Sequence, residues 1–267
     1  MEPGSVGLYN DASVYDILHA PGTREEVDGL LRMHGRFVTA KASAKLWLEP
    51  ACGTGRYLIR LAKKSVRGVG FDVDPGMVEY ATARAKRLRL APRPRFGVAT
   101  MESFVDEGLV RPGSVRLAFN LINTVRHLMS DEAMLAHFGQ MRAALAPGGV
   151  YLVGISLTVY GLEPPSEDVW EGRRGRTTVR QVVNFVPPVA SAGRARRTER
   201  IFSHLTISKP SGEEDRDSTY TLRTYDEVQW RQLVKRAGWR VLGVVDEEGD
   251  DVTLTPPGYG IFVLSPE

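Results

Sequence analysis

The short segment EPACGTGR, residues 49–56, constrains the fold of this chain more than any other. It follows an apolar run at 46–50 and precedes a run at 56–64 whose apolar residues recur with helical spacing. This order predicts a strand, a turn and a helix. Two glycines one residue apart let the backbone turn tightly and approach a ligand closely. The segment therefore predicts an α/β unit with a ligand-binding turn.

Two acids beside this turn indicate what kind of ligand it takes. Glu49 ends the first strand, and Asp72 ends the next strand, residues 66–72, about twenty residues later. A carboxylate at that second position accepts hydrogen bonds from two ribose hydroxyls. The sequence has no third glycine in G-x-G-x-x-G spacing and no Gly-Lys-Ser/Thr, which are phosphate-binding signatures. A pyrophosphate cofactor is therefore disfavoured, and a nucleoside with an amino-acid tail fits better.

The first half of the chain alternates strand-like and helix-like segments, which predicts a parallel sheet with helices on both faces. Asp74 is a favoured N-cap and Pro75 a favoured first helical residue. Ser130 caps a later helix, which we expect to end at the sequence PGG, residues 147–149. Further strands are predicted at 95–98, 115–119 and 150–155.

The pattern changes in the second half. Residues 157–222 are rich in Pro, Gly, Arg and short β-like stretches, which predicts an antiparallel insertion. Thr224 and Glu227 match a capping box, and the helix that they start is expected to stop at Gly238, before strands at 239–245 and 260–264. The expected units are an N-terminal helical cap (1–45), a Rossmann-like core (46–156), the β-rich insertion (157–222), and a C-terminal helix with the closing strands of a seven-stranded α/β sheet (223–267).

The composition is that of a globular protein, with 42% apolar and 25% charged residues among 267. The single cysteine excludes an intramolecular disulfide and a cysteine-rich zinc site. No apolar run reaches the roughly 20 residues that span a bilayer, and the first residues carry no signal-peptide pattern. We therefore expect a cytoplasmic protein with no membrane partner and no metal. The net charge of +3 is scattered along the chain, which disfavours a nucleic-acid partner.

Three motifs resemble one family. The pattern E-x-x-C-G-T-G at 49–55, the sequence GFDVDPGM at 70–77 and the sequence LAPGG at 145–149 closely resemble motifs of the class I S-adenosylmethionine-dependent methyltransferases. Shorter matches resemble the nucleotide-amino-sugar and, more loosely, the glycine-type N-methyltransferases. These shorter matches are VYDILH at 14–19, N-x-x-x-H-L at 123–128, GRT at 175–177 and GYGIFV at 258–263.

The resemblance implies a set of residues that bind S-adenosylmethionine and its product S-adenosylhomocysteine. Glu49 would face the methionine amino group, and Asp72 would hold the ribose hydroxyls. Relatives carry an acid before Met101, where this sequence has Thr100, so either the Thr100 hydroxyl or Glu102 would meet the adenine amino group. The remaining implied cofactor residues are Ala51, Gly53 and Gly55 in the turn, Val73 and Met77 beside the adenine, Met101, and Asn120 beneath the methyl group.

Methyl transfer from a sulfonium is an in-line displacement that depends mainly on alignment, and a base is needed only for a protonated acceptor. His127 follows the strand at 115–119, at the mouth where substrate meets cofactor in this fold, and histidine suits proton transfer near neutral pH. Tyr15 and His19 lie in the N-terminal segment, which folds over the site in the resembling families. We expect His127 to act as the base, and Tyr15 and His19 to contact the substrate or the sulfonium. A purely structural role is also compatible with each of the three.

The expected acceptor is a nitrogen of a small molecule, with oxygen as the second choice. Two arginine runs, 173–176 and 194–197, are either solvated charges or a site for an anionic substrate. The insertion is either a substrate cap or the surface of a homodimer. Three further functions compete with this one: an RNA or protein methyltransferase, a non-catalytic S-adenosylmethionine-binding protein and a dinucleotide oxidoreductase. The sequence lacks the Asn/Asp-Pro-Pro-Tyr/Phe motif of some nucleic-acid methyltransferases.

Overall fold

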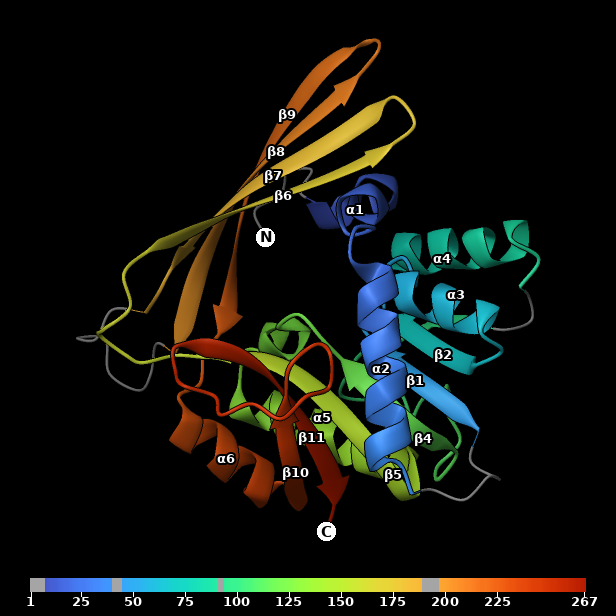
Figure 1. Cartoon of the computed structure of the whole chain (residues 1–267), viewed down its shortest axis with the longest axis vertical. Helices are drawn as coiled ribbons and strands as arrows, with labels where there is room; N and C mark the ends of the chain where they lie inside the picture. The colour runs from blue at the N-terminus through green and yellow to red at the C-terminus, as the bar shows by residue number, and fades with distance from the viewer. Residues whose placement is uncertain (1–7, 40–44, 91–93, 189–196) are drawn as a thin grey trace.

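The computed structural model describes residues 8–39, 45–90, 94–188 and 197–267. Its larger sheet has seven strands: β1 (Leu46–Pro50), β2 (Arg67–Asp72), β3 (Arg95–Val98), β4 (Val115–Asn120), β5 (Leu145–Leu157), β10 (Trp239–Val245) and β11 (Gly258–Pro266). Their spatial order is β3-β2-β1-β4-β5-β11-β10 (Figure 1). Strands β1 to β5 run parallel, whereas β11 is antiparallel to both β5 and β10. The predicted Rossmann-like seven-stranded sheet is therefore confirmed.

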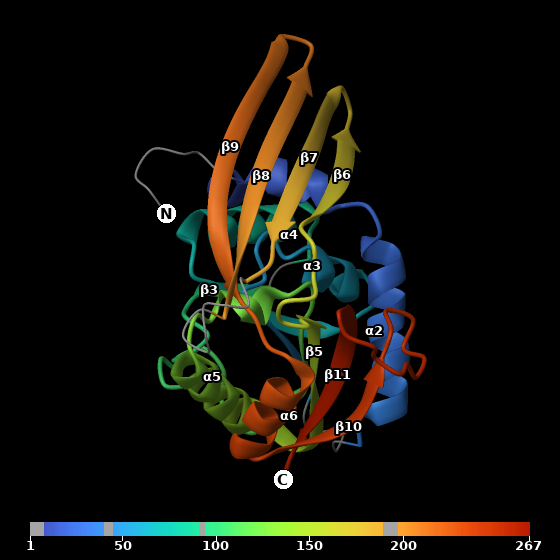
Figure 2. The same ribbon diagram turned by 90° about the vertical axis from the view of Figure 1, so that its left-hand side faces the viewer.

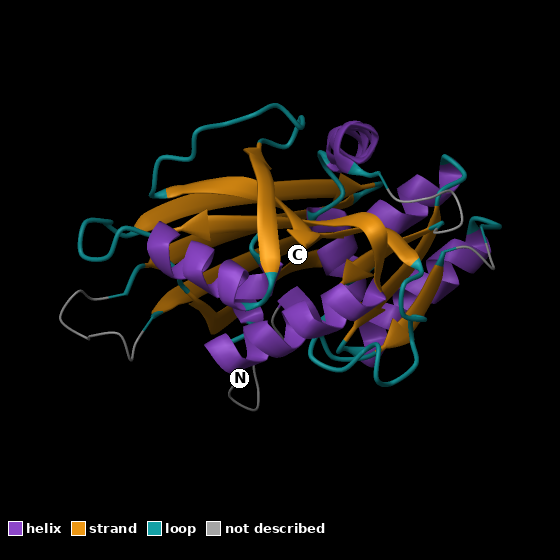
Figure 3. Ribbon diagram, turned by 90° about the horizontal axis from the view of Figure 1, so that it is seen from below, coloured by secondary structure: helices purple, strands orange, loops and turns teal. Residues whose placement is uncertain are grey.

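Helices cover both faces of this sheet (Figure 3). They are α2 (Thr23–Phe37), α3 (Arg56–Lys63), α4 (Pro75–Arg87), α5 (Asp131–Ala144) and α6 (Glu227–Arg236). Because successive strand side chains point to opposite faces, Trp47 joins a buried cluster with Leu30 of α2, whereas Leu48 joins the cluster that contains Phe138 of α5 and Trp230 of α6. Among the described residues, no helix is both long enough and apolar enough to cross a membrane.

A second, antiparallel sheet stands above the core as a separate layer (Figure 2). Its strands are β6 (Ser166–Arg174), β7 (Thr177–Val186), β8 (Thr198–Lys209) and β9 (Gly212–Arg223). Helix α1 (Ala12–Leu18) packs on its inner face, where Val14 and Ile17 meet Val179 and Leu205. The predicted antiparallel insertion after the fifth strand is thus confirmed. Its sheet occupies 166–223, because β5 continues to Leu157, which pairs with the first residue of β11.

Two predicted boundaries are wrong. Helix α5 ends at Ala144, and the sequence PGG at 147–149 lies inside β5 instead of before it. The pairing of β4 with β5 shifts register there. A Cβ on Gly149 would come within 3.0 Å of the Val115 carbonyl oxygen, so only glycine fits this irregular stretch. The glycines therefore serve strand pairing and do not end the helix.

The capping box of α6 also differs from the prediction. The N-cap is Asp226, whose side chain accepts from the Gln229 backbone N–H at 2.7 Å, while the Gln229 side chain accepts from the Asp226 backbone N–H. Thr224 is held elsewhere, because its backbone N–H donates to the Arg197 carbonyl and its hydroxyl lies 3.1 Å from the Tyr160 hydroxyl. Thr224 therefore extends the β8–β9 pairing, and the helix begins three residues later.

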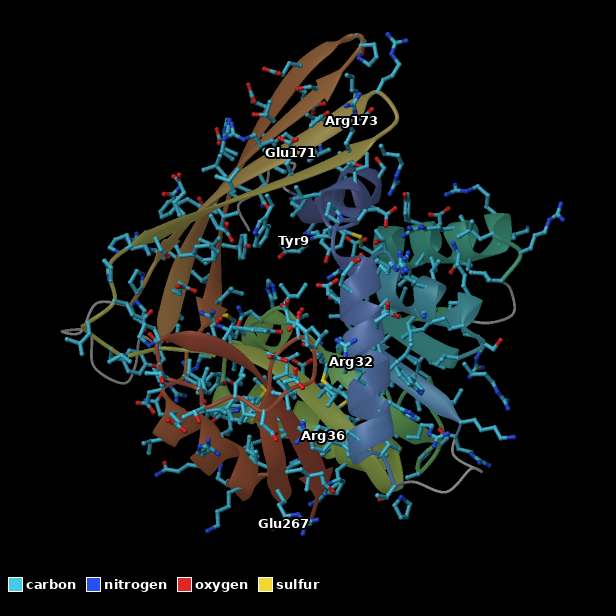
Figure 4. All side chains as sticks on the ribbon, in the orientation of Figure 1. Tyr9, Arg32, Arg36, Glu171, Arg173 and Glu267 are labelled. Carbon is cyan, nitrogen blue, oxygen red and sulfur yellow. The ribbon has the colours of Figure 1, made fainter. Side chains whose placement is uncertain are left out.

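The acidic segment 246–251 is attached to α2. Arg32 Nε donates to the Glu248 carbonyl at 2.6 Å, and Arg36 pairs with Asp251 at 2.5 Å; both arginines project from α2 in Figure 4. Gly29 permits the close approach, since a Cβ there would lie 1.9 Å from the Glu247 carbonyl oxygen. Across the described ranges, no group of three or more His, Cys, Asp or Glu side chains is arranged to hold a metal ion. These contacts therefore fix the segment that follows β10 against α2.

Candidate active site

The glycine turn joins β1 to α3 at the carboxyl edge of the sheet. Ala51, Gly53 and Gly55 all have positive φ, at 48°, 51° and 67°. A Cβ on Gly55 would lie 2.5 Å from the Phe96 ring, so this glycine is required by packing against β3. Gly53 is buried beneath the Tyr15 ring, since a Cβ on this glycine would lie 3.1 Å from Tyr15 Cε1.

Asp72, at the end of β2, is anchored by the backbone around it. One carboxylate oxygen accepts from the Gly53 N–H at 2.8 Å, and the other accepts from the Asp74 N–H at 3.0 Å. Partial burial raises the pKa of Asp72, and these backbone hydrogen bonds oppose the rise. A carboxylate oxygen has further lone pairs, so the fixed carboxylate fits two ribose hydroxyls.

Glu49 is buried at the end of β1, and its Oε2 has no hydrogen-bond partner among the described residues. Burial raises the pKa of Glu49 well above its usual range, and the nearby Arg56 guanidinium opposes that rise. Arg56 is itself paired with Glu26. A buried, unpartnered carboxylate is costly, and an arriving ammonium would supply the missing donor. Glu49 therefore fits the amino group of a methionine moiety.

The adenine-side residues lie at the ends of β2 and β3. The Val73 side chain is 68% exposed, and Thr100 is also exposed, whereas Met101 and Glu102 are half-buried. Met77 lies on α4 and is only 3% exposed. Its side chain therefore does not reach the exposed surface on which adenine is expected to bind. The exposed valine and threonine leave this end of the site open.

Asn120 is buried at the end of β4 and ties that strand to β1. Its Nδ2 donates to the Pro50 carbonyl at 3.0 Å. Its Oδ1 has no partner among the described residues. Asn120 therefore lies below the glycine turn, and its role beneath the methyl group stays a prediction.

Tyr15 lies on α1, and His19 is the C-cap residue of the same helix. Their ring centroids are 4.3 Å apart, and the Tyr15 ring lies against Gly53. Burial raises the pKa of Tyr15 to about 12 and, helped by Arg56, lowers the pKa of His19 to about 3. Both side chains are therefore neutral at physiological pH, and His19 is too weak a base to accept a proton readily.

His127 lies at the end of the 3-10 helix η2 (Thr124–His127), which follows β4. Its ring centroid is 5.8 Å from that of Tyr9 and 5.9 Å from that of Tyr220. Tyr9 lies beside α1, between the second sheet and the core (Figure 4). Partial burial, together with the Arg126 charge, lowers the pKa of His127, so the imidazole is neutral at pH 7. The Tyr9 ring thus contacts both the His127 ring and the Tyr15 ring.

Sequence reasoning did not identify Tyr9 or Tyr220. Tyr220 and Leu222 lie two residues apart on β9, and both side chains pack in the same apolar cluster. This alternation of inward-facing residues was the only sequence signal that could have identified Tyr220. Tyr9 precedes the first helical segment without any spacing that distinguishes it. Both residues become part of the site only through contacts between segments distant in the chain.

Each arginine run has one member that is paired with a carboxylate of the chain. Arg174 pairs with buried Asp16 at 2.5 Å, and Arg197 pairs with Asp131. Arg173 extends from β6 of the second sheet (Figure 4), and its Nε donates to the Gly175 carbonyl at 3.2 Å. Residues 194–196 lie outside the described residues. The paired arginines therefore do not supply free charge for an anionic substrate.

Comparison with known proteins identifies a methyltransferase domain in this chain. Residues 48–149 match the family model described as a methyltransferase domain. No curated protein matches the sequence.

Solved structures match over nearly the whole chain. An S-adenosylmethionine-dependent methyltransferase from Clostridium acetobutylicum is 14% identical, with 96% of this chain and 97% of that chain covered and a TM-score of 0.73. DesVI from Streptomyces venezuelae is 22% identical, with 96% and 98% covered and a TM-score of 0.71. CalS10, an amino pentose methyltransferase from Micromonospora echinaspora solved with S-adenosylmethionine, is 21% identical, with 100% of both chains covered and a TM-score of 0.67. The chain therefore contains a methyltransferase domain at 48–149, and its fold over nearly the whole chain is that of S-adenosylmethionine-dependent methyltransferases of known structure.

Proposed function

We propose that this methyltransferase acts on a nitrogen atom of a small molecule of the amino-sugar class. Two structures of similar fold support the proposal by the activities that they carry: CalS10 is an amino pentose methyltransferase, and KedS8 from Streptoalloteichus is a sugar N-methyltransferase. Both matches are at most 21% identical to this chain, so the acceptor is argued from the site itself.

The cofactor residues have distinct roles in this proposal. S-Adenosylmethionine supplies a methyl group on a sulfonium sulfur, which is already activated as a leaving group. Glu49 binds the ammonium of the methionine portion, and Asp72 binds the ribose hydroxyls. Gly53 lets the backbone pass close to the ligand, and Val73 offers an apolar surface to the adenine.

The mutual contact of the His127, Tyr9 and Tyr220 rings, whose centroids are 5.7–5.9 Å apart, is the observation that carries the proposal. An amine arrives as an ammonium ion, and His127 accepts one of its protons so that the nitrogen lone pair becomes available. The faces of aromatic rings stabilise cations, so Tyr9 and Tyr220 hold the ammonium beside the base. Tyr15 lies between this group and the glycine turn.

The weakness of His127 as a base favours nitrogen over oxygen. An alkylammonium has a pKa of about 10, whereas a hydroxyl such as that of water has one of about 16. A histidine whose pKa is lowered takes a proton from the first group at moderate cost and from the second only at a much larger cost. The site is thus better suited to an amine than to an alcohol.

The test uses purified protein, methyl-labelled S-adenosylmethionine and matched pairs of acceptors. Each pair consists of an amino sugar and the hydroxy sugar with the same ring, both free and nucleotide-linked, and mass spectrometry identifies the products. We expect methylation of the amine alone. The Asp72→Asn variant serves as a control for cofactor dependence.

Three results would contradict the proposal. One is methylation of the hydroxy sugar in preference to the amine. The second and third appear when the source-cell extract is offered as substrate: label in RNA would identify an RNA methyltransferase, and label in protein would identify a protein methyltransferase.

A further inference from the structure

Three hydrogen-bonded side chains follow β3 where adenine would bind. Thr100 Oγ1 and Ser103 Oγ are 2.7 Å apart, and the Ser103 hydroxyl donates to the Glu107 carboxylate. The Glu107 backbone N–H donates to the Ser103 carbonyl at 2.9 Å, which places the two side chains one helical turn apart. The chain of hydroxyls therefore ends at a carboxylate.

The carboxylate sets the direction of both hydroxyl groups. An ionised carboxylate only accepts hydrogen bonds, and a hydroxyl has one hydrogen to donate. The Ser103 hydrogen is committed to Glu107, so Ser103 accepts from Thr100, and the only hydroxyl hydrogen of Thr100 points at Ser103. Thr100 Oγ1 then presents lone pairs alone to the outside.

Thr100 lies two residues beyond Val98, the β3 residue that pairs with Asp72. Val98 pairs in register with Asp72, and the Ala99 N–H donates to the Asp72 carbonyl at 3.1 Å. The exposed Val73 follows Asp72 on the same edge. A nucleoside held by Asp72 would therefore bring its base toward Thr100.

We propose that Ser103 and Glu107 orient Thr100 as an obligate hydrogen-bond acceptor, which selects the amino group of adenine over the oxygen of hypoxanthine. This inference rests on the proposed function, because it requires Asp72 to hold the ribose. Thr100 is the specificity-determining contact, and Ser103 and Glu107 are positioning residues. We call the hydrogen-bonded series Thr100–Ser103–Glu107 the relay. It places a neutral acceptor where relatives have a charged acid.

The experiment measures the dissociation constants of S-adenosyl-L-homocysteine and S-inosyl-L-homocysteine by calorimetry. The wild type is expected to prefer the adenine compound. Ser103→Ala frees the Thr100 hydroxyl to rotate and donate to the hypoxanthine oxygen, so this preference should fall about 2- to 12-fold, the worth of one neutral hydrogen bond. The control is Ser114→Ala, since the Ser114 hydroxyl donates to the Arg111 carbonyl at 2.6 Å, away from the relay.

A second variant keeps the inference testable. Thr100→Asp in the Ser103→Ala background should restore the preference, because a carboxylate accepts without any relay. An unchanged preference in Ser103→Ala, or a wild type without preference, would overturn the relay. Failure of the wild type to bind S-adenosylhomocysteine at all would instead refute the proposed cofactor residues.

Discussion

The Tyr15 ring lies directly against the α-carbon of Gly53, so that a Cβ on this glycine would be 3.1 Å from Tyr15 Cε1. Gly53 also has a positive φ of 51° and donates its N–H to Asp72. Gly53→Ala should therefore displace either Tyr15 or the turn and weaken S-adenosylhomocysteine binding at least tenfold. Calorimetric titration of the folded variant measures this loss.

Gly108→Ala is the matched control for Gly53→Ala. Gly108 has a φ of 78°, but a Cβ there would meet nothing within 4 Å. Both variants should lose about 1 kcal/mol of unfolding free energy through backbone strain. Only Gly53→Ala should lose affinity, and equal affinity in the two variants would show that the Tyr15 contact is not needed for binding.

His127→Gln should lower kcat by about 10²- to 10⁴-fold, the usual contribution of a positioned base, while S-adenosylhomocysteine affinity stays within twofold. In the wild type, kcat should rise as pH increases through the pKa of His127, which lies below 6.5, because the neutral imidazole is the active form. The variant should lack this acidic limb, which a kcat–pH profile detects.

The control for His127 is His204→Gln, since His204 is an exposed residue of β8 paired with Asp217 at 2.8 Å. This variant should keep both the rate and the pH profile. If His127→Gln behaved like the control, the proton acceptor would have to be another group.

Asp16 joins α1 to three other parts of the molecule. Its carboxylate is 1% exposed, accepts from the Thr54 hydroxyl at 3.1 Å and pairs with Arg84 and Arg174. Removing one partner of a buried ion pair costs about 3–5 kcal/mol, so Asp16→Ala should lower the free energy of unfolding in urea by that amount. The exposed Asp217→Ala should change it by less than about 1 kcal/mol. Equal losses would show that the Asp16 network adds no more than a surface pair.

His137 makes stability depend on pH. It is fully buried, with Nδ1 3.0 Å from the Met101 carbonyl and Nε2 2.8 Å from the Tyr151 hydroxyl, and burial lowers its pKa to about 4. Below pH 6.5 the unfolded chain takes up a proton at this residue and the folded chain does not, so stability falls as pH drops. Between pH 6.5 and 4, His137 should account for a loss of about 3 kcal/mol.

Urea unfolding of His137→Gln at both pH values isolates this loss. The variant lacks the imidazole of residue 137. The lowered pKa of His19 also makes stability depend on pH, but it does so equally in the wild type and the variant. The stability difference between wild type and variant should therefore shrink at the lower pH. A constant difference would mean that the His137 pKa is not lowered in the folded protein.

Local sequence determined the strand–turn–helix unit at 46–63 and the starts of α4 and α5. Asp74 and Ser130 cap these helices as predicted, accepting from the Met77 and Ala133 N–H groups. Gly53 and Gly55 form the predicted tight turn, and both have positive φ. These features depend on the chemistry of a few adjacent residues, namely caps, proline and glycine, so a short pattern is sufficient to predict them.

The tertiary structure alone decided how the candidate site is assembled. His127 meets Tyr9 and Tyr220, which lie more than ninety positions away on either side in the chain. Asp16 likewise takes Arg174 from the second sheet, which no charge pattern in the sequence indicated. Such contacts depend on how strands pair and how layers stack over the whole chain, so the sequence determined the cofactor turn, and long-range packing determined which side chains surround it.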